Sequence, residues 1–309
     1  MKLTREVTLQ PFPVRAQSLP STAISKPVVD VPARRIRRQI AANPRLVVGL
    51  AVILLATAAA ILAPVLAPHD PDAQLFQMRL ATPNATYLLG GDELGRDVLS
   101  RLIYAGRVSL AVAFPSMIVA VVVGVVVGSL AGYYRGWVDR LLMRLTDVVL
   151  VFPTFFLLIL VVATFGRSLT LLVLMIGLTA WPTNARVVRA LMLNLRERDY
   201  VVAARVVGAN DAWIVLRHLI PQLTPVVIAS ATIRVANNIL VESGLSFLGL
   251  GVAPPTPTWG NMVSDGANFM RQAWWLVAAP GGVIFVVVMA FNLAGEGLRD
   301  LLDPRQRRR

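Results

Sequence analysis

The sequence predicts an all-α integral membrane protein with six transmembrane helices, and two observations favour this fold class. Of the 309 residues, 56% are hydrophobic and only 15% are charged, and the mean hydropathy of +0.66 lies well beyond that of an ordinary soluble domain. The apolar residues also gather in runs of about 20, the length that crosses a hydrocarbon core of about 30 Å. We therefore expect the chain to lie in a bilayer.

The six predicted spans are Leu46–Ala67, Val108–Ala131, Leu145–Phe165, Ser168–Ala185, Val226–Val252 and Trp274–Leu298. The connection between the third and fourth is very short, which predicts antiparallel neighbours. The fifth carries Arg234 and Glu242, and the sixth carries Glu296 near its end, so both are less uniformly apolar than the first four.

The segments outside these spans are predicted from composition. Residues 1–45 form a basic, disordered cytoplasmic tail, because they hold several prolines and few large apolar side chains. Residues 68–107 form an external loop that ends in an amphipathic interfacial helix with Leu94, Val98, Leu99 and Leu102 on one face. The charges of alternating sign in the same segment are typical of a solvated face; they are Asp92, Glu93, Arg96, Asp97 and Arg101. Residues 108–298 form a core that includes a cytoplasmic loop at 186–225, and residues 299–309 form a basic cytoplasmic tail.

The distribution of basic residues predicts the orientation. With both termini in the cytoplasm, 23 of the 30 lysines and arginines fall on the cytoplasmic side and six outside, with Arg234 within a span; cytoplasmic loops carry such an excess. The same asymmetry explains the net charge of +13 without a nucleic acid partner, and the arginines before the first span can contact membrane lipids. The absence of cysteine excludes disulfides, cysteine nucleophiles and thiolate metal sites, and we expect no metal site.

Two patterns within the spans indicate helix packing and a polar face. Gly124, Gly128 and Gly132 recur every four residues in the second span, which predicts a strip along which another helix packs closely. In the fifth span, four polar side chains recur at the same interval: Arg234, Asn238, Glu242 and Ser246. Charges there are costly unless compensated, so this stripe either lines a translocation pathway or packs against another helix.

The cytoplasmic loop contains a segment that suits a groove in a partner protein. We predict a short helix from Asp199 to Val207, a break at Gly208 and Asn210–Asp211, and a second helical piece that runs to Pro221. Small Ala203 and Ala204 permit close approach, whereas Tyr200 and Val207 offer apolar contacts. An ordinary amphipathic connector is the alternative.

Four strings together resemble one family: LGGDELGRDVLSRLIYAGRVSL (89–110), AARVVGANDAWIVLRHLIP (203–221), LSFLGLGVAPPTPTWGNM (245–262) and FNLAGEGLRDLLDPR (291–305). They are similar to the C-type permease subunit of bacterial dipeptide and oligopeptide ABC importers. The resemblance implies the type I importer permease fold, with a scoop-like external loop and a cytoplasmic coupling helix. It also implies location in the bacterial inner (plasma) membrane.

The resemblance further implies a non-catalytic subunit of a heteromeric complex that imports peptides by alternating access. The partners would be a homologous B-type permease, two ABC ATPases and an extracytoplasmic substrate-binding protein. The ATPases would use ATP and Mg, and this chain would bind no cofactor; its lysines, Lys2 and Lys26, lie in no phosphate-binding loop.

By the same resemblance, the segment that contacts an ATPase includes Asp199, Tyr200, Ala203, Ala204, Gly208 and Pro221. Val202 stands where the family usually has glutamate, so coupling here would rest on shape and on neighbouring charges such as Asp199. The residues themselves leave three alternatives: an ion-coupled secondary transporter or channel, a membrane assembly subunit without transport activity, and an intramembrane enzyme.

Overall fold

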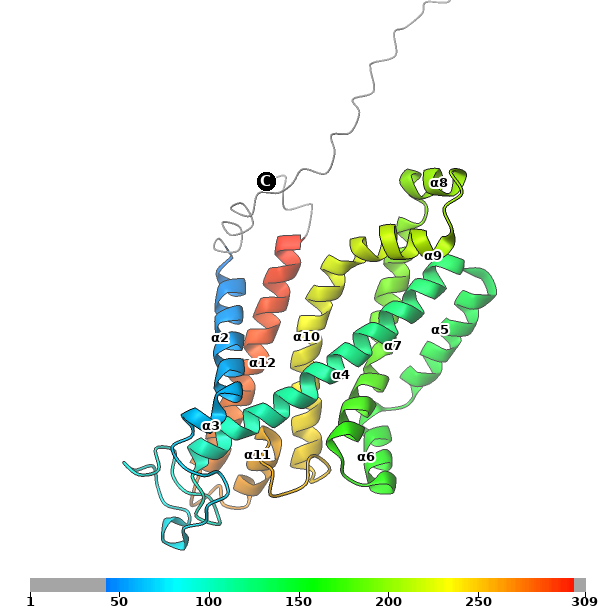
Figure 1. Cartoon of the computed structure of the whole chain (residues 1–309). Helices are drawn as coiled ribbons and strands as arrows, with labels where there is room; N and C mark the ends of the chain where they lie inside the picture. The colour runs from blue at the N-terminus through cyan, green and yellow to red at the C-terminus, as the bar shows by residue number, and fades with distance from the viewer. Residues whose placement is uncertain (1–42, 303–309) are drawn as a thin grey trace, which may run out of the picture. The chain divides into compact units, whose positions relative to one another are not determined.

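The computed structural model describes residues 43–302, and all regular secondary structure within them is helical (Figure 1). Five helical segments are long and apolar enough to cross a membrane: Pro44–Ile61, Val98–Tyr134, Leu169–Leu195, Asp211–Phe247 and Trp275–Leu301. A bent pair of helices brings the number to six if the pair counts as one span. The predicted fold class is thus confirmed. Most of the two predicted tails lies outside the described residues.

The bent pair corrects the prediction of one continuous helix over Leu145–Phe165. Helix α5 (Gly136–Val151) and helix α6 (Thr154–Phe165) meet at an angle of 78°. Phe152 is extended, with φ −76° and ψ 124°, because the ring of Pro153 disfavours a helical conformation in the residue before it. Hydropathy does not register such a bend, since both halves are apolar.

The other boundaries shift by several residues. Helix α2 (Pro44–Ile61) begins where the Asn43 side chain accepts a hydrogen bond from the Leu46 amide, and a separate short helix α3 (Ala63–Leu66) follows it. Helix α7 (Leu169–Leu195) continues ten residues beyond the predicted end at Ala185. Helices α10 (Ile220–Phe247) and α12 (Trp275–Leu302) correspond to the last two predicted spans, and short α11 (Trp259–Ala267) lies between them.

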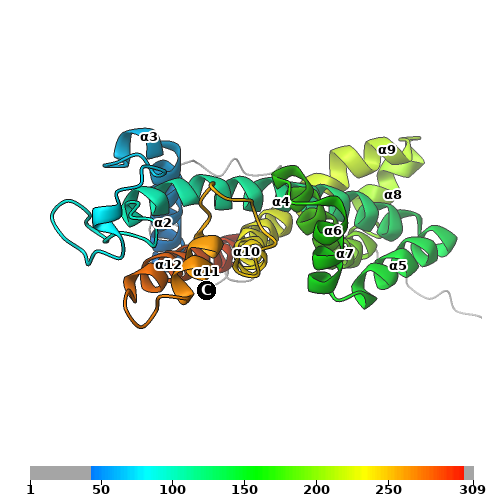
Figure 2. The same ribbon diagram turned by 90° about the horizontal axis from the view of Figure 1, so that it is seen from below.

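Helix α4 (Val98–Tyr134) joins two elements that the sequence predicted as separate. The amphipathic segment of the external loop and the second span form one 37-residue helix. The prediction of a separate interfacial helix is therefore wrong, and Leu94, which was assigned to it, precedes α4. The Asp97 carboxylate caps its start by accepting from the Leu99 and Ser100 amides. Figures 1 and 2 show α4 running obliquely past α2 and α10 to α7, and contacts with all three agree.

The glycine strip of α4 faces α7 at close range. A Cβ atom on Gly124 would lie 2.6 Å from the Asn184 Cβ, and one on Gly128 would lie 2.5 Å from the Ala185 carbonyl oxygen. A Cβ atom on Gly132 would lie 2.6 Å from the Met192 Cβ. The two helices therefore approach so closely that side chains at these positions would displace backbone or rigid Cβ atoms.

Both ends of the membrane bundle can be followed in Figure 1. The start of α2 and the end of α12 lie together, where Asn43 Nδ2 donates to the Gly297 carbonyl at 3.3 Å. The segment between α7 and α10 lies at this same end, and residues 67–97, here called the outer loop, lie at the opposite end. The outer loop includes a short 3₁₀ turn, η1 (Phe76–Met78). The segment predicted as a cytoplasmic loop therefore lies at the same end of the bundle as the start of α2 and the end of α12.

Candidate functional site

The segment that joins α7 to α10 is held on an apolar base. It consists of α8 (Asp199–Val206), α9 (Asp211–Ile214) and one π-helical turn, η2 (Val215–Leu219), which leads directly into α10. Val201, Ile214 and Leu219 are buried in one cluster with Tyr133 of α4 and Met192 of α7. The short helices are thus fixed to the ends of three membrane helices rather than being a free connector.

The opposite face of α8 carries apolar side chains that this chain does not cover. We define the α8 tip as Val202, Ala203, Val206 and Val207; all four are exposed, with Val206 at 82% and Val207 at 88%. Ala204 instead packs against the buried base. The sequence prediction included Ala203 but did not single out Val206. The exposed valines on this anchored helix form an apolar patch, of a kind that can contact another molecule.

Polar contacts fix the turn between α8 and α9. Gly208 has φ +89°, and a Cβ atom there would meet nothing within 4 Å. Glycine is therefore favoured by the positive φ angle and not by lack of space for a side chain. Asn210 caps α9 by accepting from the Trp213 amide at 2.7 Å. Tyr133 Oη donates to Asp211 Oδ1 at 2.6 Å. Asp211 thus connects α9 to the end of α4.

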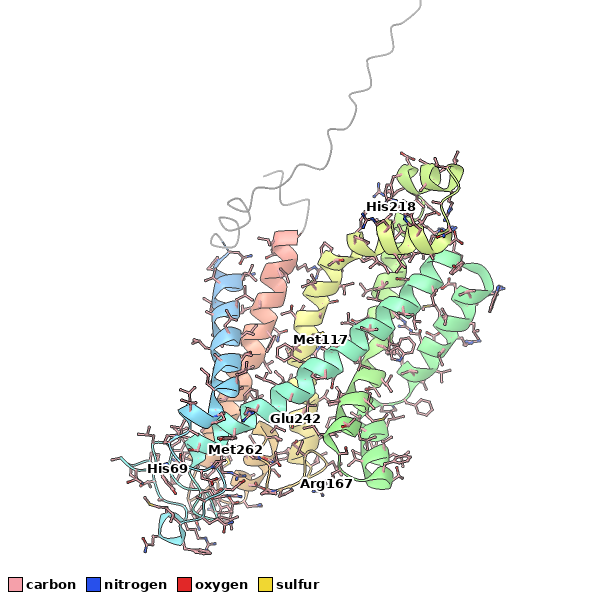
Figure 3. The ribbon with its side chains drawn as sticks, in the orientation of Figure 1. His69, Met117, Arg167, His218, Glu242 and Met262 are labelled. Atoms are coloured by element: carbon pink, nitrogen blue, oxygen red, sulfur yellow. The ribbon has the colours of Figure 1, made fainter. Side chains whose placement is uncertain are left out.

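Further contacts connect α8 to the start of α10. Gln222 Nε2 donates to Tyr200 Oη at 2.9 Å. The His218 ring centroid lies 6.2 Å from that of Tyr200 and 4.6 Å from that of Trp213, and Figure 3 shows His218 at this end of the molecule. Pro221 is exposed in the first turn of α10, directly after the π-helical turn η2. Sequence reasoning missed Tyr133, His218 and Gln222, because only the fold brings them to this segment.

The predicted stripe on α10 divides into two environments. Asn238, Glu242 and Ser246 are buried within this chain. Ser109 Oγ of α4 donates to Glu242 Oε2 at 3.1 Å, and Ser246 Oγ donates to Glu242 Oε1 at 2.6 Å. Figure 3 shows Glu242 where α10 passes behind α4. These contacts join α10 to α4 inside the subunit.

Two further bonds extend this buried polar cluster, which we define as Ser109, Asn238, Glu242 and Ser246. Asn238 Nδ2 donates to the Ala113 carbonyl of α4 at 3.2 Å. The Trp259 amide, at the start of α11, donates to Ser109 Oγ at 3.3 Å. The buried polar cluster therefore connects α10, α4 and α11, which is the geometry of a packing contact.

Arg234 differs from the other three members of the stripe because it is only half-buried. Its Nη2 lies 3.4 Å from Asn184 Oδ1 of α7. Successive positions four apart turn by about 40° around a helix, so a stripe that is buried at Ser246 reaches the edge of the subunit at Arg234. The four residues predicted as one stripe thus do not share one surface.

Charges in the outer loop form an ion-pair network with the start of α4. Arg96 Nε lies 2.6 Å from Asp92 Oδ2, Arg96 Nη2 lies 2.9 Å from Glu93 Oε1, and Arg101 Nε lies 3.6 Å from Asp92 Oδ2. Asp92, Arg96 and Arg101 are buried, so the prediction of a solvated face is wrong for them. Burial, and secondarily the Asp92 carboxylate, raise the pKa of Glu93. The alternating charges stabilise the loop fold.

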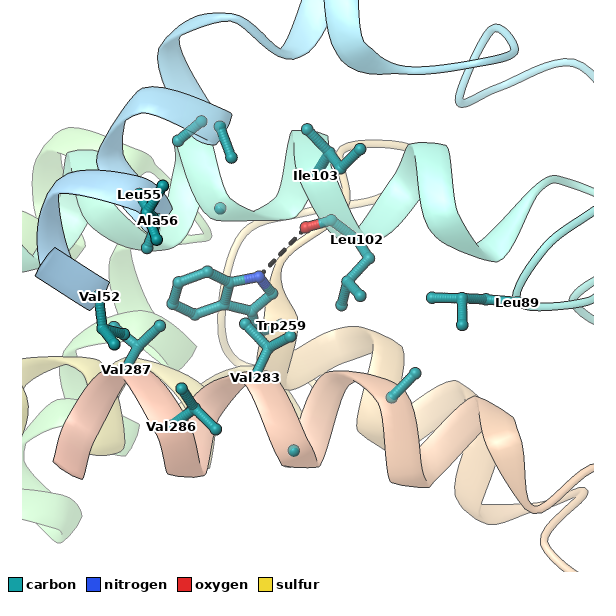
Figure 4. Close-up of a pocket in the computed structure, with 15 residues that line it drawn as sticks. Val52, Leu55, Ala56, Leu89, Leu102, Ile103, Trp259, Val283, Val286 and Val287 are labelled. Carbon is teal, nitrogen blue, oxygen red and sulfur yellow. Dashed lines mark hydrogen bonds between the residues drawn. The ribbon is translucent and has the colours of Figure 1, made fainter. Parts of the chain in front are cut away.

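An apolar pocket of about 610 Å³ lies between α2, α4 and α12 (Figure 4). Trp259 lines it and donates from Nε1 to the Leu102 carbonyl at 3.2 Å. Leu55, Val283 and Val286 are among the other lining residues. Because its lining is apolar and lies between membrane helices, the pocket suits hydrocarbon rather than a polar ligand.

Comparison with known proteins gives matches over most of the chain. The family model described as binding-protein-dependent transport system inner membrane component matches residues 124–308. A second model, the N-terminal TM domain of oligopeptide transport permease C, matches residues 32–83. The first contains the glycine strip, the loop with α8 and α9, and the whole of α10.

Individual relatives agree. The chain is 39% identical over 269 residues to the dipeptide transport system permease protein DppC of Haemophilus influenzae, covering 85% of this chain and 91% of that protein. It is 38% identical over 284 residues to the di/tripeptide transport system permease protein DppC of Pseudomonas aeruginosa, covering 90% and 94%. It is 41% identical over 273 residues to the oligopeptide transport system permease protein OppC of Escherichia coli K12, covering 88% and 90%. The chain therefore belongs to the family of binding-protein-dependent transport system inner membrane components.

Proposed function

We propose that this chain is one membrane subunit of an ATP-driven importer that carries peptides into the bacterial cytoplasm. The three relatives named above belong to dipeptide, di/tripeptide and oligopeptide transport systems. Each is matched over at least 90% of its own length, which supports the same role for this chain. The proposed cargo class is peptide, and we assign the selection of peptide length to the substrate-binding protein.

The proposed complex contains four kinds of protein. A homologous permease would complete the membrane pathway, two ABC ATPases would bind the cytoplasmic side, and a substrate-binding protein would deliver peptide to the outer side. ATP and Mg would bind the ATPases, and this chain would hold no cofactor and catalyse no reaction. ATP binding would favour an outward-facing state and hydrolysis would reset it, which requires two packings of similar free energy.

The exposed α8 tip is the observation that most directly supports contact with an ATPase. Its valines stand out from a base that is anchored to α4, α7 and α10. A small apolar helix of this kind can fill a groove in a partner. Val202 replaces the glutamate usual in the family, so we assign the contact to shape and apolar area, with Asp199 as a neighbouring charge.

Movement of α8 would reach the membrane helices through the contacts around it. The Tyr200–Gln222 bond joins α8 to α10, and the Tyr133–Asp211 bond joins α9 to α4. The π-helical turn η2 continues into α10 without a loop. We therefore propose that α8 and α10 move together, so that an ATPase can reposition the helix that carries Arg234.

Along α10, we assign the translocation pathway to the Arg234 end of the stripe. Arg234 reaches the edge of the subunit, where a pathway between two permeases would run. Asn238, Glu242 and Ser246 hold α10 to α4 within the subunit. For these three we propose a structural role.

The test compares two matched substitutions in the reconstituted complex. Val206→Asn places a polar group on the α8 tip, whereas Val65→Asn makes the same change at a valine that is 81% exposed on α3. Neither removes much contact within this chain, so both variants should assemble. We expect Val206→Asn to reduce peptide uptake per ATP hydrolysed at least about fivefold, because loss of roughly 1 kcal/mol at an interface corresponds to that factor.

Val65→Asn should leave uptake per ATP within about twofold of the unaltered complex, a change of less than 0.5 kcal/mol. If Val206→Asn behaves in the same way, the α8 tip does not contact the ATPase. If the unaltered complex takes up peptide without an ATPase, the ion-coupled alternative is correct instead.

A further inference from the structure

Two side chains near the middle of their membrane helices end in buried donors that have no acceptor among the described residues. They are Nε of Arg234 on α10 and Nδ2 of Asn184 on α7. Asn184 is only 6% exposed, and Arg234 is half-buried beside it. The contact between them, Arg234 Nη2 to Asn184 Oδ1 at 3.4 Å, leaves both of these donors free. A buried donor without an acceptor is costly.

The positive charge of Arg234 has no carboxylate partner within residues 43–302. Ion pairs there join other arginines to aspartate or glutamate. Glu242, two turns along α10, already accepts from Ser109 and Ser246. An arginine at this depth in a membrane helix needs an anion or water to compensate it. The compensating group therefore comes from outside the described part of this chain.

The face of α10 around Arg234 is polar and partly exposed. Asn237 is exposed, and Ser230 is half-buried one turn on the other side of Arg234. These positions lie three and four residues from Arg234, so the three side chains share one face of the helix. A face with an arginine and an exposed amide is unfavourable against lipid. It is suited to border a hydrated pathway.

We propose that Arg234 and Asn184 form a transient binding site for the carboxylate of the transported peptide. This inference rests on the proposed function and assigns the chemistry of one step in it. The planar guanidinium presents parallel donors that match two carboxylate oxygens, and the Asn184 amide adds a donor beside them. A C-terminal carboxylate is common to peptides of any side-chain composition, so a site that recognises it is compatible with varied cargo.

Because Arg234 Nε and Asn184 Nδ2 are both buried in this conformation, the carboxylate must reach them from the exposed side of Arg234 when the helices shift during transport. The cavity next to Asn184 and Ser230 has a volume of about 10 Å³, which is room for about one water molecule. The closely packed helices α4 and α7 close the opposite side, where Gly124 meets Asn184. The ligand would thus bind at the edge of the subunit, where it can also leave.

The first test measures uptake of two forms of one dipeptide in proteoliposomes that hold the whole complex, with saturating binding protein. One form has a free C-terminal carboxylate and the other is amidated. We expect Arg234→Gln to lower uptake of the free form at least about tenfold, which is the effect of one charged hydrogen bond. Uptake of the amidated form should change less than about twofold. Arg234→Lys should restore part of the loss, since it returns the charge.

A charge-loss control is Arg271→Gln, at an exposed position outside the membrane helices, which should lower neither uptake. The binding protein is identical in every sample, so its own preference for either peptide cancels when variants are compared. An equal loss for both peptides, or failure of Arg234→Gln to assemble with its partners, would show that Arg234 pairs with a partner subunit's carboxylate. Either result overturns the carboxylate site.

A second measurement does not require delivery of the amidated peptide. The chain has no cysteine, so Asn237→Cys introduces a single thiol, three residues from Arg234. Maleimide labelling of this thiol can be followed on this chain after the subunits are separated. Free peptide with ATP and binding protein should slow labelling at least about threefold, and adding Arg234→Gln should abolish this protection. A thiol that reacts in no state would contradict the inference, because the face would then be covered by another subunit.

Absence of uptake by the unaltered complex would have a different meaning. It would contradict the proposed importer function itself, before any variant is compared. Uptake by the unaltered complex with no difference between the two peptides in Arg234→Gln would contradict only the carboxylate site.

Discussion

Glu242 is a carboxyl group that is fully buried in the middle of a membrane helix, and no basic residue within 43–302 forms an ion pair with it. Hydroxyl donors from Ser109 and Ser246 compensate its burial instead. Buried polar groups are tolerated when their hydrogen bonds are complete. Glu242 therefore stabilises the contact between α10 and α4, and the energetic cost of disturbing it should appear in folding.

We predict that Glu242→Leu lowers the stability of the complex by about 1–3 kcal/mol, because it leaves buried hydroxyl groups without an acceptor. Glu242→Gln should cost less, since its amide oxygen still accepts a hydrogen bond. Thermal unfolding of the purified complex measures both. A Glu242→Leu complex as stable as the original, but inactive in uptake, would instead assign Glu242 to the transport pathway.

At Gly208 the constraint is in the backbone. Its φ of +89° lies in a region that a β-branched residue rarely adopts, whereas asparagine tolerates positive φ. Gly208→Val should strain the turn by about 1–2 kcal/mol and displace α8, so that ATP hydrolysis continues while uptake falls. Gly208→Asn is the matched control and should retain most uptake. ATPase and uptake assays on the isolated complexes give the ratio; equal uptake in both variants would contradict the prediction.

Residue spacing located the polar positions on α10 but did not show which surface each of them occupies. The four-residue interval from Arg234 to Ser246 places them near one another on a helix, yet burial depends on where α4 and α11 pack. Similarly, the alternating charges from Asp92 to Arg101 are typical of a solvated face in the sequence, but in the structure they form buried ion pairs. In both cases the missing information is the neighbouring helix or loop, which lies far away in sequence.

At the scale of helices, the contact between α4 and α7 depends on residues without side chains. Gly128 meets the Ala185 carbonyl and Val188 at distances that leave no room for a Cβ atom, whereas Gly281 of α12 has nothing within 4 Å. The two glycines therefore offer the same substitution in opposite surroundings.

We predict that Gly128→Ala destabilises the complex by about 1–3 kcal/mol, the usual cost of overpacking. Gly281→Ala should be neutral or stabilising by up to about 1 kcal/mol, because alanine favours the helix. Unfolding temperatures of the two purified variants test this. Equal shifts in both would mean that the helices separate easily at Gly128.

The presence of most helices was predictable from the sequence, whereas the residues at which they begin and end were not. Hydropathy located the candidate membrane spans found within residues 43–302, because apolar runs are long. It could not show that α4 continues through the external segment or that Pro153 bends the third span. Both outcomes follow from local chemistry: Asp97 starts a helix, and proline restricts Phe152. The short helices α8 and α9 were predicted because Gly208 and Asn210 interrupt a helical pattern.

For the whole molecule, the two ends of the bundle carry different kinds of surface. One end presents the anchored α8 with exposed valines, and the other carries the outer loop with its buried ion pairs. Arg234 lies between them with no anionic partner within residues 43–302. The exposed valines of α8 and the unpaired charge of Arg234 are incomplete in a single chain, which agrees with a subunit of a larger assembly. The family membership gives the same conclusion independently.

The most direct test of this conclusion is mass spectrometry of the proteins that copurify with a tagged form of this chain from gently solubilised native membranes. We predict a homologous permease and ABC ATPases, with the ATPases lost from the Val206→Asn variant during prolonged washing before the permease is. Recovery of this chain alone or as a homo-oligomer, under conditions that preserve other membrane complexes, would contradict the importer assignment and favour a self-sufficient transporter.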